Sequence, residues 1–455
     1  MKHMKTNISN LTKMTLHFRV IIFLTCITIG SANSQQKWDL NKCIQYTLEN
    51  NNSLKNAEIN KKLQRIHLSQ TRINLLPQIG AGLGVKESFG RSVNPATNTY
   101  ADVNNLENTY GIDASMTIFS GFAKLNRIAF EKYNLKVEDN RLEQQKNLVT
   151  YNVIDAYFNL LLHQGVYSLQ QENLKLMQEQ YTSIKKYIKV GRKAESDIYE
   201  FDAKLATDSF LLVQQTGAMD KALLQLKATM NFPIGDSLMV DTVLFSVNPL
   251  IDTIQSGFLT ETAMKQLPKL KVTENQLFAA MKYVAQVRGA FSPSIEMYAG
   301  WNTSYYKTSG VGALPLNEQL KNNAGQYVGL SLKIPIFDRL SRINTLRSAK
   351  LEYKKAENNH LENLAYIEME INAAYIDWQT AKNEYFAAEK QLEKSEVAFL
   401  TAEKKFGIGQ INVIEFYIQK NELLRAKTEL LRTNLQLALK EKYVQFLLSG
   451  KWESN

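Results

Sequence analysis

The sequence predicts a mixed fold, in which four transmembrane β-strands per chain contribute to a shared oligomeric barrel that continues into a long barrel of coiled-coil α-helices. Three observations support this prediction. The 455-residue chain contains only eight prolines and 21 glycines, which favours long uninterrupted elements. The same succession of patterns occurs twice along the chain. Within each copy, alternation of apolar and polar residues gives way to an apolar repeat of seven residues.

Residues 1–34 are predicted to be a signal peptide that is removed during export. Four basic residues and no acid precede an apolar run that starts at Val20 and is about ten residues long. Small residues before Gln35 fit a cleavage site. Removal of the four basic residues leaves 50 Lys and Arg against 44 Asp and Glu, so the net charge falls from +10 to +6. The remaining basic residues are interspersed with Glu and Gln, a pattern that does not indicate a nucleic-acid partner.

The rest of the chain is predicted to consist of two structural repeats, separated by a linker and followed by a tail. These segments are, in order, 35–232, 233–258, 259–450 and 451–455. Leu54–Pro77 aligns with Leu270–Pro293 at an offset of 216 residues, and beyond the next loop the offset is 218. At that offset Gly191 coincides with Gly409. We therefore expect each repeat to contain a helix, a pair of strands and a long helical hairpin.

Each repeat contains two predicted strands with one apolar face. Their predicted bounds are 78–88 and 109–119 in the first repeat, and 294–304 and 326–337 in the second. About ten residues suffice for a tilted strand to cross a bilayer, and the apolar rows carry no charge. The opposite face is small and polar, and its candidates for lining a lumen are Asp113, Ser115, Ser331 and Lys333. For any one strand taken alone, the alternative to a membrane-crossing strand is a strand of a half-buried sheet on a soluble core.

A long helical hairpin is predicted after each strand pair, at 121–231 and 339–449. Ser120 and Asp338 are placed to cap the first helix of each hairpin. That helix contains no proline in either repeat and is expected to be on the order of 100 Å long. Its apolar positions form the a and d rows of a coiled coil. They include Leu142, Val149, Val153 and Leu160 in the first repeat, and Ile371, Trp378, Phe399 and Phe406 in the second.

The predicted strands cannot be accommodated by one chain alone. The smallest closed barrels in membranes have about eight strands, and an open strand edge cannot face lipid. The apolar seams of the hairpins also need neighbouring helices to cover them. Several chains must therefore share one barrel, and a ring of strands continuous with a ring of hairpins forms a channel.

In these features the chain resembles the TolC-like outer-membrane efflux proteins, also called outer membrane factors. The resemblance extends from Trp38-Asp39-Leu40 to Leu447-Leu448-Ser449-Gly450 and includes an aromatic-x-x-Gly turn, which is Phe406-x-x-Gly409 in the second hairpin. It implies a homotrimer in the outer membrane of a Gram-negative bacterium, with a large periplasmic portion. It also implies an exit duct of a tripartite efflux pump or type I secretion system, whose partners are a periplasmic adaptor (membrane fusion) protein, an inner-membrane transporter and outer-membrane lipid.

The resemblance places a gate at the hairpin tips, where acidic residues follow the turn. Asp197, preceded by Ser196, lies six residues after Gly191, and Glu415 lies six residues after Gly409. Phe406 occupies the position where the family can carry a gate tyrosine. Ile411 and Ile418 likewise lack the polar groups that the family pattern carries at their positions. For both acids, ordinary stabilisation of a helix N-terminus is the alternative.

No enzyme activity, metal site or cofactor is predicted. After the signal peptide the histidines are His67, His163 and His360, which lack the spacing of zinc ligands. Cys43 is expected to be a buried thiol, and no phosphate-binding or nucleophile-elbow motif occurs. The alternative function is a secreted periplasmic coiled-coil scaffold or adaptor without a channel. No residue set indicates the transported substrate.

Overall fold

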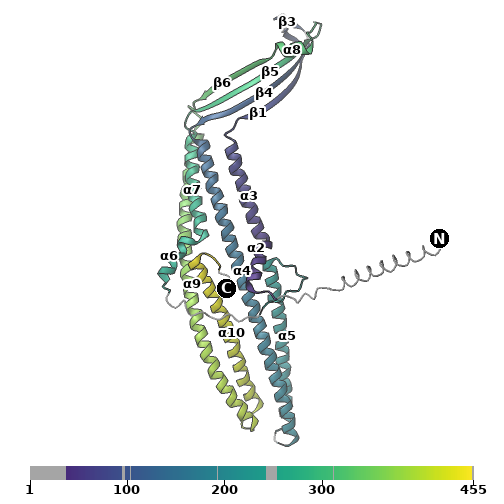
Figure 1. Cartoon of the computed structure of the whole chain (residues 1–455), viewed down its shortest axis with the longest axis vertical. Helices are drawn as coiled ribbons and strands as arrows, with labels where there is room; N and C mark the ends of the chain where they lie inside the picture. The colour runs from purple at the N-terminus through teal and green to yellow at the C-terminus, as the bar shows by residue number, and fades with distance from the viewer. Residues whose placement is uncertain are drawn as a thin grey trace, which may run out of the picture.

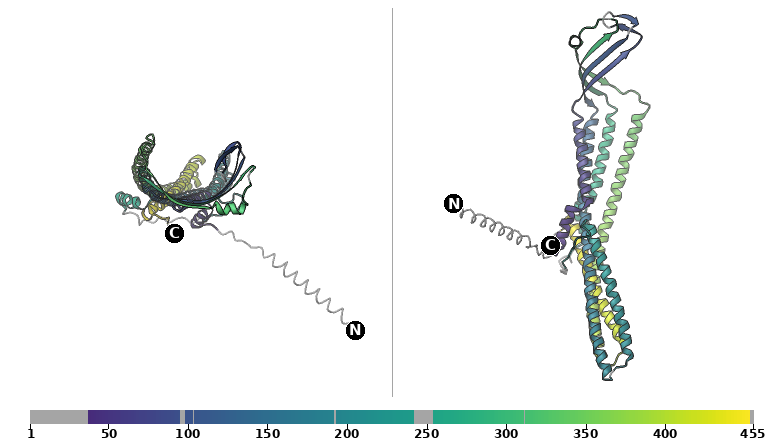
Figure 2. Two further views of the ribbon diagram at one scale, coloured as in Figure 1. Left: turned by 90° about the horizontal axis from the view of Figure 1, so that it is seen from above. Right: turned by 90° about the vertical axis from the view of Figure 1, so that its right-hand side faces the viewer.

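The computed structural model describes residues 37–94, 98–102, 104–191, 193–241, 254–310 and 312–452. The predicted signal peptide and residues 242–253 of the predicted linker lie outside these residues. The chain forms one elongated protomer with a curved sheet at one end and two hairpin tips at the other (Figures 1 and 2). No helix in the described ranges has the length and apolar character needed to span a bilayer.

The two repeats contain the same order of main elements. In the first they are α2 (Leu40–Asn50), α3 (Asn52–Ile73), β1 (Gln78–Ser88), β4 (Asn105–Ser120), α4 (Ala123–Lys189) and α5 (Ser196–Met230). In the second they are α6 (Ser256–Gln266), α7 (Pro268–Gly289), β5 (Ser294–Thr308), β6 (Gly325–Lys333), α9 (Ser341–Gly407) and α10 (Val413–Ser449). Both α4 and α9 have 67 residues, so each is about 100 Å long.

The structure corrects several predicted boundaries. β4 and β5 are longer than predicted because they are the central strands of the sheet and pair with each other as far as Asn105 and Thr308. β6 ends at Lys333, opposite Ser294 at the start of β5, so Ile334 and Ile336 have no strand residue to pair with. α6 begins at Ser256, inside the predicted linker.

The loops predicted between the strands contain regular elements of their own. A small hairpin forms from β2 (Arg91–Asn94) and β3 (Thr99–Asp102), and the second loop contains the short helix α8 (Leu316–Asn322). α8 packs beside β5 above the start of β6. There the Gln319 side-chain oxygen accepts a hydrogen bond from the backbone N–H of Tyr306, and the side-chain NH₂ donates one to the backbone C=O of Tyr306. An amide side chain thus replaces a neighbouring strand at this edge.

The four main strands form an antiparallel sheet in the order β1-β4-β5-β6. Residues paired across strands share a face, so the register separates an apolar face from a polar one. Leu83 and Val328 on the apolar face are 82% and 71% exposed, so no part of the described protomer covers it. On the polar face, the Tyr327 hydroxyl donates to Asp113. The register also places Ser115, Ser331 and Lys333 on this face.

The predicted N-caps differ from those in the structure. Ser120 is the last residue of β4, and Phe122 caps α4 in the left-handed conformation without a side-chain hydrogen bond in the described chain. The Asp338 carboxylate does accept the backbone N–H of Arg342 and its guanidinium Nε, at 3.0 and 2.8 Å. Gly121 has φ +62°, and a Cβ there would collide with the Gly289 carbonyl oxygen. Backbone packing against α7, and not a capping hydroxyl, therefore shapes the first strand-to-helix turn.

The predicted seams form the buried cores of the helical part. Leu142, Val149, Val153 and Leu160 of α4 are at most 6% exposed, and Ile371 and Trp378 of α9 at most 2%. A separate cluster near the tips contains residues of both hairpins: Met177, Ile184, Phe201, Phe399, Phe406, Val413, Phe416 and Tyr417. In the middle of the molecule α4 lies beside α3 and α7, and α7 lies beside α9 (Figure 1).

Candidate functional site: the hairpin tips

The tip of the first hairpin is the turn between α4 and α5. Gly191 has φ +72°, a conformation that favours glycine, and its N–H donates to the carbonyl of Ile188 at 2.9 Å. Glu195 is the N-cap residue of α5 and makes no side-chain capping bond within the described ranges. Asp197 lies in the first turn of α5, half-buried, and its N–H donates to Ala194 at 3.2 Å. Its neighbour Ser196 is exposed.

The second tip has the same glycine but a different helix start. Gly409 has φ +81°, and its N–H donates to Phe406 at 3.1 Å. Asn412 caps α10: its Oδ1 accepts the N–H of Glu415 at 2.8 Å, and its Nδ2 donates to Glu415 Oε1 at 3.0 Å. The Glu415 carboxylate therefore takes part in a reciprocal cap of its own helix, which stabilises the helix start.

Phe406 lies inside the protomer. Its side chain is 4% exposed and stacks on Phe416, with ring centroids 4.7 Å apart, while Phe201 of the other hairpin is at 6.0 Å. The Lys193 ammonium lies 4.3 Å from the ring centroid. Phe406 therefore has little exposed surface within the described protomer, and its assignment to a gate stays a prediction.

The two acids lie at different heights in the protomer. Asp208 of α5 and Lys420 of α10 form an ion pair at 2.6 Å, which sets the alignment of these two helices. With that alignment, Glu415 is level with residue 203, six residues above Asp197. At 1.5 Å per residue the separation along the helices is about 9 Å. The sequence repeat offset of 218 had placed Asp197 and Glu415 at equivalent positions, but packing between the hairpins shifts them.

Asp208 and Lys420 were missed from the sequence, although a signal exists. A step of seven residues leads from Phe201 to Asp208 and from Val413 to Lys420, so a charged residue occupies an apolar seam position on each helix. Burial lowers the pKa of the Lys420 ammonium, opposed by its bond to Asp208. Burial also raises the pKa of the neighbouring Tyr417 hydroxyl.

No cluster of three or more His, Cys, Asp or Glu side chains in the described part of the chain is arranged to hold a metal ion. Cys43 is fully buried in the core beside α4. Burial raises the pKa of its thiol to about 12. The thiolate that a nucleophile requires is therefore scarce at neutral pH.

Comparisons with known proteins identify the family. A family model described as outer membrane efflux protein matches residues 43–231 and 259–450. The chain belongs to the outer membrane efflux protein family. The match covers both repeats, including the two hairpin tips described above.

Individual relatives agree with this membership. TtgC of Pseudomonas putida, described as a probable efflux pump outer membrane protein, is 24% identical over 431 residues, 91% of this chain and 83% of TtgC. PrtF of Dickeya chrysanthemi, described as a proteases secretion protein, is 20% identical over 354 residues, 74% of this chain and 72% of PrtF. The CmeC outer membrane channel of Campylobacter jejuni has the same fold, with a TM-score of 0.79, 20% identity, and coverage of 91% of this chain and 86% of CmeC.

These findings confirm the predicted family, the predicted location in the outer membrane of a Gram-negative bacterium, and the predicted role as an efflux channel. The alternative of a secreted scaffold without a channel is not favoured. The family consists of channels and not of enzymes.

Proposed function

We propose that this efflux protein works as a homotrimer, the outer-membrane exit duct of a tripartite efflux pump or type I secretion system. The observation that carries the proposal is the unfinished sheet: β1 and β6 are its edges, and neither has a second partner strand in the described chain. Unpaired backbone groups are costly in lipid. β6 of one chain therefore pairs with β1 of the next, and three chains supply twelve strands, enough to close a barrel.

The helical part supports the same assembly. One side of the protomer exposes an apolar stripe on α3, formed by Ile59, Leu63 and Ile66, which are 50%, 49% and 63% exposed. The opposite side exposes a stripe on α9, formed by Leu351, Met369 and Ile376 at 68%, 59% and 63%. α3 and α9 are the two lateral helices in Figure 1. Contact between two different apolar surfaces on opposite sides is head-to-tail, and such a contact generates a ring when the rotation between neighbours closes.

In the proposed trimer, the polar sheet face lines the channel and the hairpin tips form its gate. Asp113, Ser115, Ser331 and Lys333 then face the lumen. Asp197 and Glu415 form two rings of three carboxylates, about 9 Å apart along the axis. Rings of like charge favour cations and repel one another. The hydrogen bond from Asn412 holds one oxygen of each Glu415 carboxylate. The Glu415 ring is therefore proposed to contribute less to gating than the Asp197 ring.

The remaining partners follow from the architecture. We infer that a periplasmic adaptor (membrane fusion) protein joins the hairpin region to an inner-membrane transporter. The relatives include an efflux pump component and a protease secretion protein, so the proposed duct architecture suits small molecules and polypeptides alike. Selection of the substrate is then a property of the transporter.

Purified protein reconstituted in planar bilayers tests this proposal. We expect trimers that form cation-preferring pores of low conductance, and Asp197→Ala together with Glu415→Ala is expected to raise the conductance and weaken the cation preference. Asp220→Ala, which removes an exposed carboxylate farther along α5, is the matched control and should change neither property. A double variant with unchanged conductance and selectivity would exclude the gate assignment. Monomeric protein without pores would exclude the duct itself.

A further inference from the structure

Two tyrosines on the polar face of the sheet lie over glycines of the neighbouring strand. Tyr327 of β6 is paired with Gly300 of β5. Tyr298 of β5 is paired in the same way with Gly329 of β6. A Cβ added to either glycine would come within 2.5 Å of the Cζ atom of the tyrosine opposite. Each glycine therefore leaves the space that the phenol end of one tyrosine occupies.

Tyr327 lies along the sheet and does not stand up from it. Its hydroxyl donates a hydrogen bond to Asp113 of β4, the residue that pairs with the other edge of Gly300. The tyrosine therefore reaches across the whole of β5, a span of two strand spacings or about 10 Å. A ring perpendicular to the sheet could not make this contact. The sheet thus covers one side of the ring, and the other side is open, since Tyr327 is 43% exposed.

The two tyrosine rings are close enough to contact the same ligand. The ring centroids of Tyr298 and Tyr327 are 6.1 Å apart, with an angle of 53° between the planes. Tyr298 is 42% exposed, so it also has an open side. A cation is attracted to the face of an aromatic ring within about 6 Å of its centroid. A single cation between the rings can therefore interact with both.

Asp113 adds a negative charge that no neighbouring side chain in the described sheet balances. Three acids of the four main strands lie on the polar face, namely Asp113, Glu107 and Glu296. Glu107 has Lys86 opposite it on β1. Lys333 lies two residues beyond the β6 partner of Glu296. The residues opposite and diagonal to Asp113 are glycine, glutamine, tyrosine and asparagine, so this acid has no basic neighbour.

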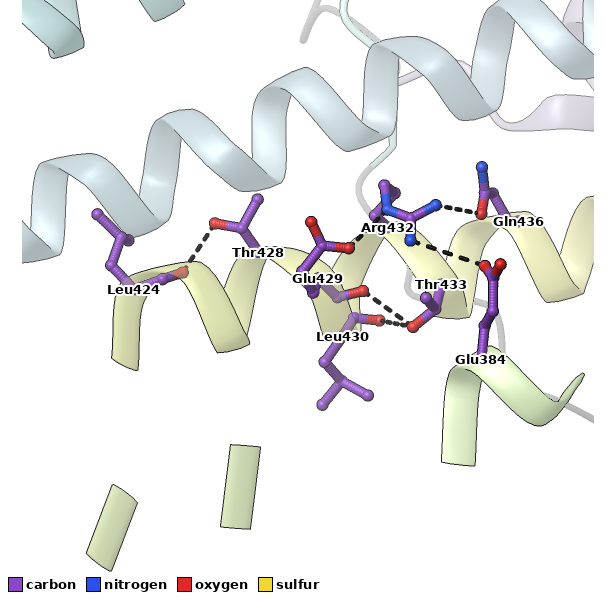
Figure 3. A network of polar contacts seen from close by, with 8 residues as sticks. All are labelled: Glu384, Leu424, Thr428, Glu429, Leu430, Arg432, Thr433 and Gln436. Atoms are coloured by element: carbon purple, nitrogen blue, oxygen red, sulfur yellow. Dashed lines mark hydrogen bonds and ion pairs between the residues drawn. The ribbon is translucent and has the colours of Figure 1, made fainter. Parts of the chain in front are cut away.

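The helical part provides a contrast, because acids there have a cation from their own chain. The Arg432 guanidinium of α10 lies 2.8 Å from Glu429 and 3.7 Å from Glu384 of α9 (Figure 3). A ligand cation would have to compete with Arg432 for these carboxylates. Asp113 presents its charge without such a competitor, which favours binding of a cation beside the two rings.

We propose that Asp113, Tyr298 and Tyr327 form a binding site for organic cations on the wall of the β-barrel lumen. The inference rests on the proposed trimer, in which the polar sheet face lines the channel and the site occurs three times. The ligand class follows from the groups present: aromatic faces beside a carboxylate recognise a quaternary or protonated amine that carries apolar groups. The open sides of the rings contact the apolar groups, and the carboxylate balances the charge.

Block of reconstituted trimers by tetrabutylammonium tests the site. In about 1 M KCl the screening length is about 3 Å, so acids that do not contact the ligand contribute little. Asp113→Asn should weaken the block at least about fivefold, and Tyr298→Leu at least about threefold. Tyr298→Phe keeps the ring and should block as the wild type does. Glu107→Gln, which removes an acid with a basic neighbour from the same face, is the matched control and should leave the block unchanged.

Calorimetry on detergent-solubilised trimers provides a second readout that does not require conduction. The affinities for tetrabutylammonium should fall in the same variants and by similar factors. The Asp197→Ala, Glu415→Ala variant should bind tetrabutylammonium as tightly as the wild type does, because the proposed site lies in the sheet and not at the hairpin tips.

The outcomes that overturn the inference are distinct. Unchanged block and affinity in both Asp113→Asn and Tyr298→Leu would do so, as would a loss in Glu107→Gln as large as that in Asp113→Asn. Loss of binding in the variant of the tip acids alone would place the ligand at the tips and equally overturn the site. Absence of pores in the wild-type protein would instead overturn the proposed function, and calorimetry keeps that result distinguishable from the others.

Discussion

The two hairpin tips have the same turn but different support. Gly191 and Gly409 both have positive φ, and an acid follows each glycine after six residues. In the second tip Asn412 caps α10 and binds Glu415, whereas Glu195 makes no capping bond at the start of α5 in the described chain. The duplicated sequence therefore preserves the shape of the turn, while the stability of the helix start and the freedom of the acid differ between the copies.

The residues three positions before the two turn glycines also differ in burial, and again the second tip is the better supported. Phe406 is 4% exposed and stacks on Phe416. Its counterpart at the repeat offset of 218 is Ile188, which is only half-buried at the edge of the same cluster. The second tip is thus both better capped and better packed, which suggests that the first tip is the more mobile of the two and that Asp197 is the freer acid.

The largest effect should come from Phe406→Ala. Loss of a buried phenyl ring leaves a cavity between the hairpins and should cost about 3–5 kcal/mol in local stability. Ile188→Ala, the matched change in the first tip, removes a half-buried side chain and should cost at most about 2 kcal/mol. Hydrogen exchange of the amides in the last turns of α4 and α9 measures both values. Equal losses in the two variants would contradict the difference in packing.

A smaller effect is expected from Asn412→Ala. This change removes the acceptor for the Glu415 N–H and the donor to its carboxylate, and loss of a helix cap costs about 1 kcal/mol. Faster exchange should be confined to the first turn of α10. Asn412→Ser keeps an acceptor oxygen and should lose less. If Ala and Ser gave the same protection, the cap would not be the source of stability at this tip.

The smallest effect should follow Glu195→Asn, which offers α5 the cap that α10 already has. Glu195 lies in the right-handed helical region at φ −65° and ψ −27°, so the backbone must shift before a side chain can cap the helix. We therefore expect a gain of at most about 0.5 kcal/mol in the protection of the first amides of α5. Glu195→Gln, which removes the charge but supplies no short side chain, is the control. A gain that is as large with Gln would point to charge and not to capping.

Much of the fold could be predicted from local patterns. The seven-residue repeat identified Leu160 and Trp378 as core residues, and both are at most 2% exposed. The alternation in the strands placed Asp113 and Lys333 on one polar face, as the sheet register has them. Patterns of this kind depend on the geometry of one helix or strand, which the sequence encodes directly.

The tip was harder to predict because its geometry depends on contacts between distant segments. Phe406 was assigned to a gate by its position in a motif, but packing against Phe201 and Phe416 buries it. Asp208 and Lys420 are 212 residues apart in the chain, and the repeat offset does not bring them together. Only the packing of one hairpin on the other decides which residues meet.

The sequence by itself determined the repeats, the strand faces, the long helices and the family, because each of these follows from residue periodicity along one element or from similarity along the chain. The tertiary structure decided the extent of β6, the different heights of Asp197 and Glu415, and the buried ion pair between the hairpins. These features depend on how far one element is displaced along its neighbour, and that displacement is set by side-chain packing across elements, which no single-element pattern contains.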